Sequence, residues 1–208
     1  MPVNYSKNYR INMKPFAESS EQNWKPIFSV IQPLLASSDS VLEVGSGTGQ
    51  HAIYFSELLP HLTWQCSDRL ENHAGINMWI EDAGLNNVLP PLELDTLRSH
   101  WPDTGYDAIF SANTVHIMSW GAVEAFFAGA GKCLKPGGML LLYGPFNYHG
   151  QFTSDSNARF DQWLKDRDPQ SGIRDFEELD RLASQAGMEL AEDYEMPENN
   201  RLLYWKKL

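Results

Sequence analysis

Cysteine and basic residues are scarce in this chain, and long apolar runs are absent. Neither of the two cysteines, Cys66 and Cys133, has His or Cys partners at metal-ligand spacing, so we expect reduced core thiols and no metal site. No apolar run approaches the ~20 residues that a membrane span requires, and the first residues lack the charge and apolar core of a secretory signal. These absences predict a soluble, cytoplasmic protein without a membrane partner.

Negative charge exceeds positive charge. The 208 residues include 27 acidic and 16 basic ones, which gives a net charge of -11 and a pI near 4.9. Proteins bind phosphate backbones through clustered Lys and Arg, and the basic residues here are scattered. We therefore expect a small-molecule substrate and no nucleic-acid partner, while the oligomeric state stays open.

Helical and strand periodicities alternate along the chain, as in a doubly wound α/β domain. The hydrophobic content of 42% can cover both faces of a sheet, so we expect one domain over residues 1–208. Residues 1–20 are expected to form an N-terminal arm or lid, and residues 21–36 a leading helix. Further helices are expected over residues 71–82, ended by Gly84, and over residues 121–132, 152–166 and 175–185, the last ended by Gly187.

The most informative stretch is residues 41–49, which read VLEVGSGTG. Val41, Leu42 and Val44 are typical of a buried parallel strand, and the glycines that follow allow a sharp turn close to a ligand. Residues 50–59 have helical spacing. A strand, a glycine turn and a helix form the first unit of a doubly wound sheet, whose ligands lie beyond the carboxyl ends of the strands.

The glycine spacing separates two classes of nucleoside cofactor. A dinucleotide fingerprint needs a third glycine three residues after the second, and Gln50 stands at that position. Glu43, two residues before the first glycine, favours a cationic ligand over a diphosphate, and S-adenosylmethionine carries a sulfonium and an ammonium. Asp68, after a strand expected at residues 62–67, can accept hydrogen bonds from both ribose hydroxyls in either cofactor class.

Five ordered landmarks over roughly a hundred residues resemble those of the class I S-adenosylmethionine-dependent methyltransferases. They are the acid and glycines of residues 43–49, Asp68, the Leu-Asp-Thr of residues 94–96, the strand and turn of residues 106–113, and the turn and strand of residues 134–143. More narrowly, residues 16–23, 144–147 and 196–200 resemble a methyltransferase-like family known mainly as a domain of unknown function. Where that family has Glu-Arg-Asn, residues 21–23 read Glu-Gln-Asn, without the arginine.

The resemblance implies a seven-stranded, mostly parallel Rossmann-like sheet with an antiparallel last strand, in which residues 188–195 and 201–206 form the final edge. It implies S-adenosylmethionine as cofactor and S-adenosylhomocysteine as product. The methionine part is expected near the glycine turn, the ribose at the second strand and the adenine near the third. The implied cofactor-binding residues are Glu43, Gly45, Ser46, Gly47, Gly49, Asp68, Asp95, Thr96 and Asn113.

Methyl transfer requires mainly an in-line nucleophile, exclusion of water and charge support. If the nucleophile is a hydroxyl, His116 is the best placed proton acceptor, because it follows the fourth strand and an unperturbed histidine titrates near neutrality. A structural hydrogen-bonding role is the competing interpretation, and His149 is a weaker candidate for the proton. Aromatic residues around the fifth strand are candidate substrate contacts, with ordinary loop packing as the alternative: Tyr143, Phe146 and Tyr148, together with Trp120.

The sequence leaves several functions open. The first is transfer of a methyl group to an unidentified small molecule. The second is a catalytically silent S-adenosylmethionine-binding sensor or interaction protein, since no required catalyst is identified. A nicotinamide oxidoreductase is a further alternative, which Gln50 disfavours. Methyltransferases of bases and glutamine side chains have Asn-Pro-Pro-Tyr or Asp-Pro-Pro-Tyr where residues 111–114 read Ser-Ala-Asn-Thr, so those substrates are disfavoured as well.

Overall fold

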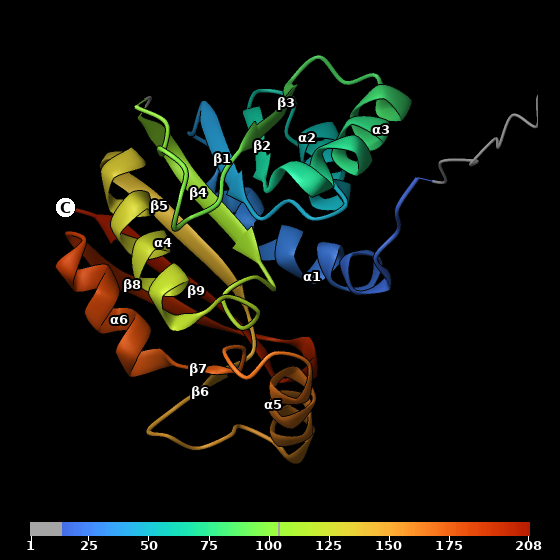
Figure 1. The fold of residues 1–208 in the computed structure, drawn as a ribbon. Helices are drawn as coiled ribbons and strands as arrows, with labels where there is room; N and C mark the ends of the chain where they lie inside the picture. Colours follow the sequence, from blue (N-terminus) through green and yellow to red (C-terminus); the bar gives the residue numbers. More distant parts are fainter. Residues whose placement is uncertain (1–13, 104) are drawn as a thin grey trace, which may run out of the picture.

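The computed structural model describes residues 14–103 and 105–208. Helices and strands alternate over much of the chain (Figure 1). The helices are α1 (Glu18–Leu34), α2 (Gln50–Leu58), α3 (His73–Ala83), α4 (Trp120–Cys133), α5 (Asp155–Arg167) and α6 (Phe176–Gln185), with 3-10 turns η1 (Leu70–Asn72) and η2 (Pro197–Asn199). The strands are β1 (Ser40–Val44), β2 (Thr63–Asp68), β3 (Val88–Glu93), β4 (Tyr106–Ala112), β5 (Leu134–Gly144), β6 (Phe146–Asn147), β7 (Arg174–Asp175), β8 (Met188–Met196) and β9 (Asn200–Lys207). β4, β6 and β9 each follow another strand without an intervening α-helix.

Seven strands form one sheet in the order β3-β2-β1-β4-β5-β9-β8. The pairs from β3 to β5 are parallel, and β9 is antiparallel to both β5 and β8. The predicted seven-stranded, mostly parallel sheet with an antiparallel last strand is therefore confirmed. β9 lies inside the sheet and β8 forms its edge, while β6 and β7 form a separate short ladder.

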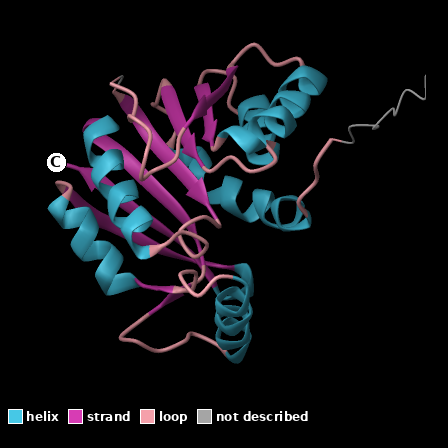
Figure 2. Cartoon of the chain, viewed as in Figure 1, coloured by secondary structure: helices cyan, strands magenta, loops and turns pink. Residues whose placement is uncertain are grey.

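Helices cover both faces of the sheet (Figure 2). Side chains from α1, α2 and α3 pack in one core, and side chains from α4 and α6 pack in the other. Alternate residues of each strand enter opposite cores, so that Val41 belongs to the first and Leu42 to the second. With both faces covered, the carboxyl ends of the parallel strands are left as the place for a ligand.

Several boundaries differ from the predicted ones. α1 begins at Glu18, three residues before the predicted start at residue 21. The helix predicted for residues 71–82 begins as η1, continues as α3 and ends as predicted at Gly84, which has φ 62°. α5 begins three residues later than predicted, because the hydroxyl of Ser154 accepts from the Asn157 amide at 3.1 Å and caps the helix there.

Both cysteines are free and buried, Cys66 in β2 and Cys133 at the end of α4. No helix in the described part of the chain combines the length and the apolar character needed to traverse a bilayer. Within residues 14–103 and 105–208, no three His, Cys, Asp or Glu side chains gather as metal ligands would.

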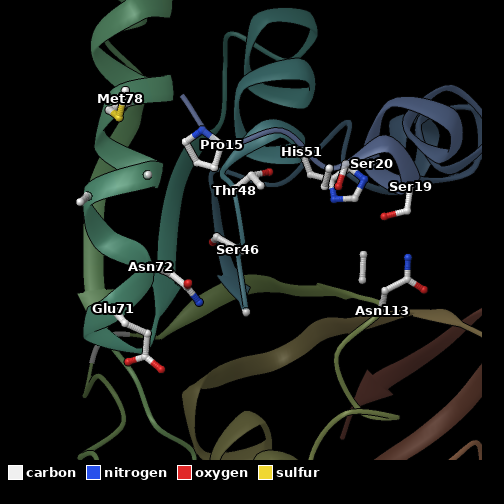
Figure 3. Close-up of a pocket in the computed structure, with 16 residues that line it drawn as sticks. Pro15, Ser19, Ser20, Ser46, Thr48, His51, Glu71, Asn72, Met78 and Asn113 are labelled. Atoms are coloured by element: carbon white, nitrogen blue, oxygen red, sulfur yellow. The ribbon is translucent and has the colours of Figure 1, made fainter. Parts of the chain in front are cut away.

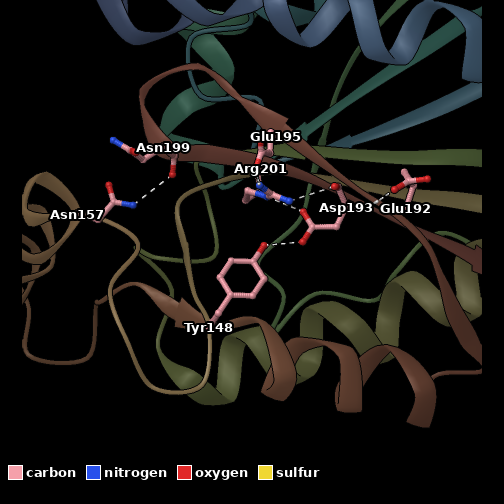
Figure 4. A network of polar contacts seen from close by, with 7 residues as sticks. All are labelled: Tyr148, Asn157, Glu192, Asp193, Glu195, Asn199 and Arg201. Atoms are coloured by element: carbon pink, nitrogen blue, oxygen red, sulfur yellow. Dashed lines mark hydrogen bonds and ion pairs between the residues drawn. The ribbon is translucent and has the colours of Figure 1, made fainter.

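A polar network ties the β8–β9 hairpin to the chain that follows β6 (Figure 4). Arg201 donates from Nε to Oδ1 of Asp193 at 2.7 Å, and the Tyr148 hydroxyl donates to Oδ2 of the same carboxylate at 2.7 Å. Glu195 adds an ion pair of 3.1 Å to Arg201 Nη1. The network thereby fixes the Tyr148 ring against the hairpin.

Candidate functional site

A cavity of about 500 Å³ opens at the carboxyl ends of β1 and β4, a size within the ~300–1,000 Å³ typical of small-molecule sites. Five parts of the chain line it: the start of α1 with the residues before it, the glycine turn, the start of α2, η1 with α3, and the end of β4 (Figure 3). The lining residues are Pro15, Ala17, Ser19, Ser20, Gly45, Ser46, Gly47, Thr48, His51, Glu71, Asn72, Ala74, Gly75, Met78, Ala112 and Asn113.

The glycine turn after β1 forms one wall of the cavity. Gly45 has φ 76° and Gly47 has φ 59°, values that strain other residue types. A Cβ added to Gly45 would lie 2.4 Å from Thr114 Cγ2, whereas one added to Gly47 would have no atom within 4 Å. Gly45 therefore allows the turns after β1 and β4 to pack closely, and Gly47 leaves bare backbone beside the cavity.

Gly49 and Ser46 hold the same turn against its neighbours. Gly49 precedes α2 with φ 92°, and a Cβ there would lie 3.2 Å from Ile76 Cα, so α2 and α3 can approach each other closely. The Ser46 hydroxyl accepts from the Ser67 amide at 3.2 Å. Ser46 lines the cavity, while Gly49 lies behind its wall.

Asp68 ends β2 and is bonded directly to the glycine turn. Its Oδ2 accepts from the Gly47 amide at 2.6 Å. Its Oδ1 accepts from the Arg69 amide at 2.7 Å and from Asn72 Nδ2 at 2.8 Å. Gly47 and Asn72 both line the cavity, whereas Asp68 lies behind them, so a carboxylate held by three hydrogen bonds lies at the junction of the glycine turn and the start of α3.

Glu43 lies behind the glycine turn rather than in the cavity wall. Its side chain is 2% exposed, and Oε2 accepts from Trp64 Nε1 at 3.1 Å. Burial raises the pKa of Glu43 to about 7, although the bonds to Trp64 and Ser46 oppose the rise. This carboxyl group is therefore only partly ionised near neutral pH, and a cation bound nearby would favour its charged form.

The residues before α1 cross the starts of α2 and α3. The Gln50 side chain is fully buried, accepts from the Ala17 amide at 2.6 Å and donates to the Ala17 carbonyl at 3.3 Å. Trp79 Nε1 donates to the Pro15 carbonyl at 2.7 Å. The described part of the predicted arm or lid thus closes one side of the cavity, and residues 1–13 lie outside the described residues.

His51 is a cavity residue that the sequence analysis did not single out. Its Nε2 lies 2.7 Å from Asn23 Oδ1, and burial lowers the pKa of His51 to about 4, so the ring is neutral at pH 7. Figure 3 places it on the same side of the cavity as Ser19, Ser20 and Asn113. Its position in the first turn after the glycine loop was the available signal, because that turn faces the ligand end of the sheet.

Asp95 and Thr96 do not line the cavity. β3 ends at Glu93, and both residues lie in the loop beyond it. Asp95 Oδ1 accepts from the Leu97 amide at 3.0 Å, and Thr96 Oγ1 donates to the Ala122 carbonyl at 3.2 Å. In this structure the two side chains hold the loop after β3, and α3 supplies that side of the cavity instead.

The predicted catalytic and substrate residues also lie outside the cavity lining. Phe146 and Tyr143 are buried in the two cores, at 0% and 3% exposure, and Tyr148 is held by Asp193. His116 is 5% exposed, and its Nδ1 has no hydrogen-bond partner in the described chain. Burial, with a smaller effect from the Arg174 charge, lowers the pKa of His116 to about 4.

Residues 14–207 match the family described as Protein of unknown function (DUF938). Among solved structures, the fold is similar to the S-adenosylmethionine-dependent methyltransferase SibL, with a TM-score of 0.77 and 20% identity over 91% of this chain and 55% of that one. It is also similar to the mitomycin 7-O-methyltransferase MmcR, with a TM-score of 0.78 and 14% identity over 91% and 55%.

A third similar structure is an O-methyltransferase family 2 protein from Planctomyces limnophilus in complex with apigenin, with a TM-score of 0.73 and 18% identity over 84% of this chain and 52% of that one. The chain spans about half the length of these structures. It belongs to the DUF938 family and has the Rossmann-like fold of the S-adenosylmethionine-dependent methyltransferases.

Proposed function

We propose that this protein binds S-adenosylmethionine in the cavity and transfers its methyl group to a small molecule. The observation that carries the proposal is the hydrogen bond of 2.6 Å from the Gly47 amide to Asp68 Oδ2, because Gly47 lies in the cavity wall at the carboxyl ends of the strands and Asp68 lies directly behind it. A carboxylate there can accept from ribose hydroxyls, and a turn without side chains admits the rest of a nucleoside.

The two ends of the cavity suit the two ends of this cofactor. On the α3 side, the apolar side chain of Met78 lines the cavity and offers a surface for a flat base (Figure 3). Across the cavity, Ser20, His51 and Asn113 present polar groups suited to an amino acid. The adenine contacts expected of Asp95 and Thr96 remain a prediction.

When bound, the cofactor supplies a methyl carbon already activated by its sulfonium, so the chain has mainly to position groups and exclude water. The segment from Pro15 to Ser20 shields one side of the cavity. Glu43 provides a carboxylate behind the turn whose ionisation a cation would favour. His116 is neutral at pH 7 and therefore free to accept the proton that an attacking hydroxyl loses, but its lowered pKa makes it a weak base.

A hydroxyl is the acceptor group that we favour, because the proteins of similar fold include a mitomycin 7-O-methyltransferase and an O-methyltransferase family 2 protein. A catalytically silent binder would have the same cavity and differ only in turnover. A nicotinamide cofactor is disfavoured because Gln50 fills the position of the third glycine and its side chain is bonded to Ala17.

Thermal unfolding with added ligands tests the cofactor. A ligand that binds only the folded protein adds ~2.7 kcal/mol of stability at a hundred times its dissociation constant. We expect S-adenosylmethionine and S-adenosylhomocysteine to raise the melting temperature and NAD to leave it unchanged. A shift with NAD alone would reject the cofactor assignment.

Turnover separates an enzyme from a silent binder. We expect formation of S-adenosylhomocysteine with at least one member of a metabolite panel, and loss of that activity in Asp68→Ala. Glu81→Ala, which removes an exposed carboxylate of α3, is the control and should behave as wild type. Binding without turnover across the panel would favour the silent binder.

A further inference from the structure

The ring of His51 is held on several sides by the protein. Its Nε2 lies 2.7 Å from Asn23 Oδ1. The ring stacks on Phe55 at a centroid distance of 5.4 Å, and an edge-to-face contact of 5.9 Å joins it to Phe110. The side chain is 7% exposed. These contacts fix the orientation of the ring, and Nδ1 is the polar atom that none of them occupies.

His51 Nδ1 is open to the cofactor cavity. His51 lines that cavity, and no group of the described chain bonds to Nδ1. Fully buried polar atoms without a partner are found elsewhere in the described chain, at His116 Nδ1 for example, but His51 Nδ1 is not one of them. A histidine that is almost entirely buried therefore presents one free ring nitrogen to a ligand.

Asn23 determines which nitrogen of the His51 ring carries the proton. Burial lowers the pKa of His51 to about 4, so at pH 7 one ring nitrogen is protonated and the other has a lone pair. An amide oxygen can only accept, so Asn23 Oδ1 requires the proton on Nε2. Nδ1 is then a hydrogen-bond acceptor at the cavity.

The same contact gives a role to part of the Glu-Gln-Asn stretch of α1. Asn23 bonds to His51, and Glu21 Oε2 accepts from the Tyr54 hydroxyl at 2.7 Å, so both residues bind side chains of α2. Gln22, which stands where the family pattern has an arginine, is exposed and bonds within α1. Of these contacts, the one made by Asn23 reaches a residue of the cavity wall.

The surroundings of His51 Nδ1 favour an ammonium group as its partner. A lone pair needs an N–H or O–H donor, and among the charged groups of the cofactor only the ammonium has one. Within the described residues, no Lys or Arg side chain lines the cavity, so no fixed cation repels an ammonium there. Ser20 and Asn113 lie on the same side of the cavity and have O–H and N–H groups suited to the carboxylate of the same amino acid (Figure 3).

We infer that Asn23 is a positioning residue for the cofactor: it holds the His51 ring so that Nδ1 accepts a hydrogen bond from the ammonium group. His51 thereby separates nucleosides that carry an amino acid from nucleosides that do not. The inference rests on the proposed function, because it requires the methionine part of the cofactor to lie beside His51.

Two thioether nucleosides test the inference. S-adenosylhomocysteine carries the amino acid, and 5′-methylthioadenosine has a methyl group in place of the amino acid chain. In calorimetric titrations at pH 8, wild type should bind S-adenosylhomocysteine more tightly. In Asn23→Leu, the Kd of S-adenosylhomocysteine should rise about tenfold, while the Kd of 5′-methylthioadenosine stays within about twofold of wild type. Equal losses for the two nucleosides would assign Asn23 to the fold alone.

Tyr54→Phe is the matched control. It removes a neighbouring hydrogen bond between α1 and α2, the one to Glu21, and leaves His51 in place. Tyr54 does not line the cavity, so both Kd values should stay near those of wild type. If Tyr54→Phe weakened S-adenosylhomocysteine binding as much as Asn23→Leu does, loosening of the two helices would explain both, and the positioning role would be overturned.

Two further variants show whether Asn23 acts through His51. His51→Leu should weaken S-adenosylhomocysteine binding at least as much as Asn23→Leu does, and combining the two substitutions should add no further loss. Additive losses would overturn the inference. Asn23→Asp keeps an oxygen that accepts from Nε2, so at pH 8, where the imidazole is neutral, it should bind S-adenosylhomocysteine nearly as wild type does. Binding as weak as that of Asn23→Leu would contradict an oxygen acceptor at this position.

Nuclear magnetic resonance of protein labelled with ¹⁵N in its histidines reports the tautomer directly. The His51 signals, identified by their loss in His51→Leu, should show the proton on Nε2 in wild type. A proton on Nδ1 would overturn the inference. Failure of wild type to bind either nucleoside would instead reject the proposed function on which the inference rests.

Discussion

Glycines of similar backbone conformation have different surroundings in this protein. Gly47 and Gly137 both have positive φ and open space around an added Cβ, but only Gly47 lines the cavity. Alanine at either position should lower the free energy of unfolding by about 1–2 kcal/mol, because the left-handed conformation strains it. Only Gly47→Ala should also weaken binding of S-adenosylmethionine in calorimetric titration. Equal binding by both variants would contradict the placement of the cofactor against the turn.

The buried carboxyl group of Glu43 predicts a pH dependence of stability. Its pKa is about 7 in the folded protein and 4.5 when unperturbed, so the folded state binds more protons between those values and wild-type stability falls as pH rises across them. Glu43→Gln keeps an acceptor for Trp64 and cannot ionise. From pH 4.5 to 7, its unfolding free energy relative to wild type should rise by on the order of 3 kcal/mol. Urea unfolding at a series of pH values measures this difference, and a constant difference would contradict the buried, protonated acid.

At the level of elements, the segment before α1 is held to α2 by the amide of Gln50. Gln50→Leu keeps the volume of the side chain but removes two hydrogen bonds to the Ala17 backbone. We expect the unfolding free energy to fall by about 1–3 kcal/mol, since the Ala17 amide loses its partner. S-adenosylmethionine should also dissociate faster in stopped-flow experiments, because this segment closes the cavity.

Gln22→Leu is the matched control for that experiment, because Gln22 is exposed and, among the described residues, its side chain bonds only to Glu18 one turn earlier in α1. It should leave both stability and dissociation nearly unchanged. Equal dissociation rates for wild type and Gln50→Leu would show that the segment does not retain the ligand.

At the level of the whole molecule, β9 joins the two cores. Leu202 enters one and Leu203 the other, and both side chains are fully buried. Leu203→Ala should cost about 2–5 kcal/mol and preserve a single unfolding transition in urea. Leu89→Ala, on the edge strand β3 and 38% exposed, should cost much less. Two separate unfolding transitions in Leu203→Ala would contradict the view that β9 couples the two cores.

The parallel part of the sheet could be predicted because its signals are local, whereas the antiparallel edge of residues 188–195 and 201–206 was implied only by the family resemblance. Apolar runs such as Val41 to Val44 and the glycines after them act over a few residues, and a helix ends at Gly84 for the same reason. The start of α1 was missed because Ala17 has no capping side chain, so no polar residue marks the boundary. The start of α5 after Ser154 was also missed. Serine is a common capping residue, but the prediction followed the spacing of apolar residues, which does not mark the cap.

The sequence by itself determined the class of sheet, the place of the glycine turn and the acid at the end of β2, because these depend on spacing along the chain. Only the tertiary structure decided that Glu43 lies behind the turn, that Gln50 binds the segment before α1, and that Asn23 binds His51. Burial and contact between distant residues depend on how the helices pack on the sheet. The spacing of residues along the sequence carries no information about this packing.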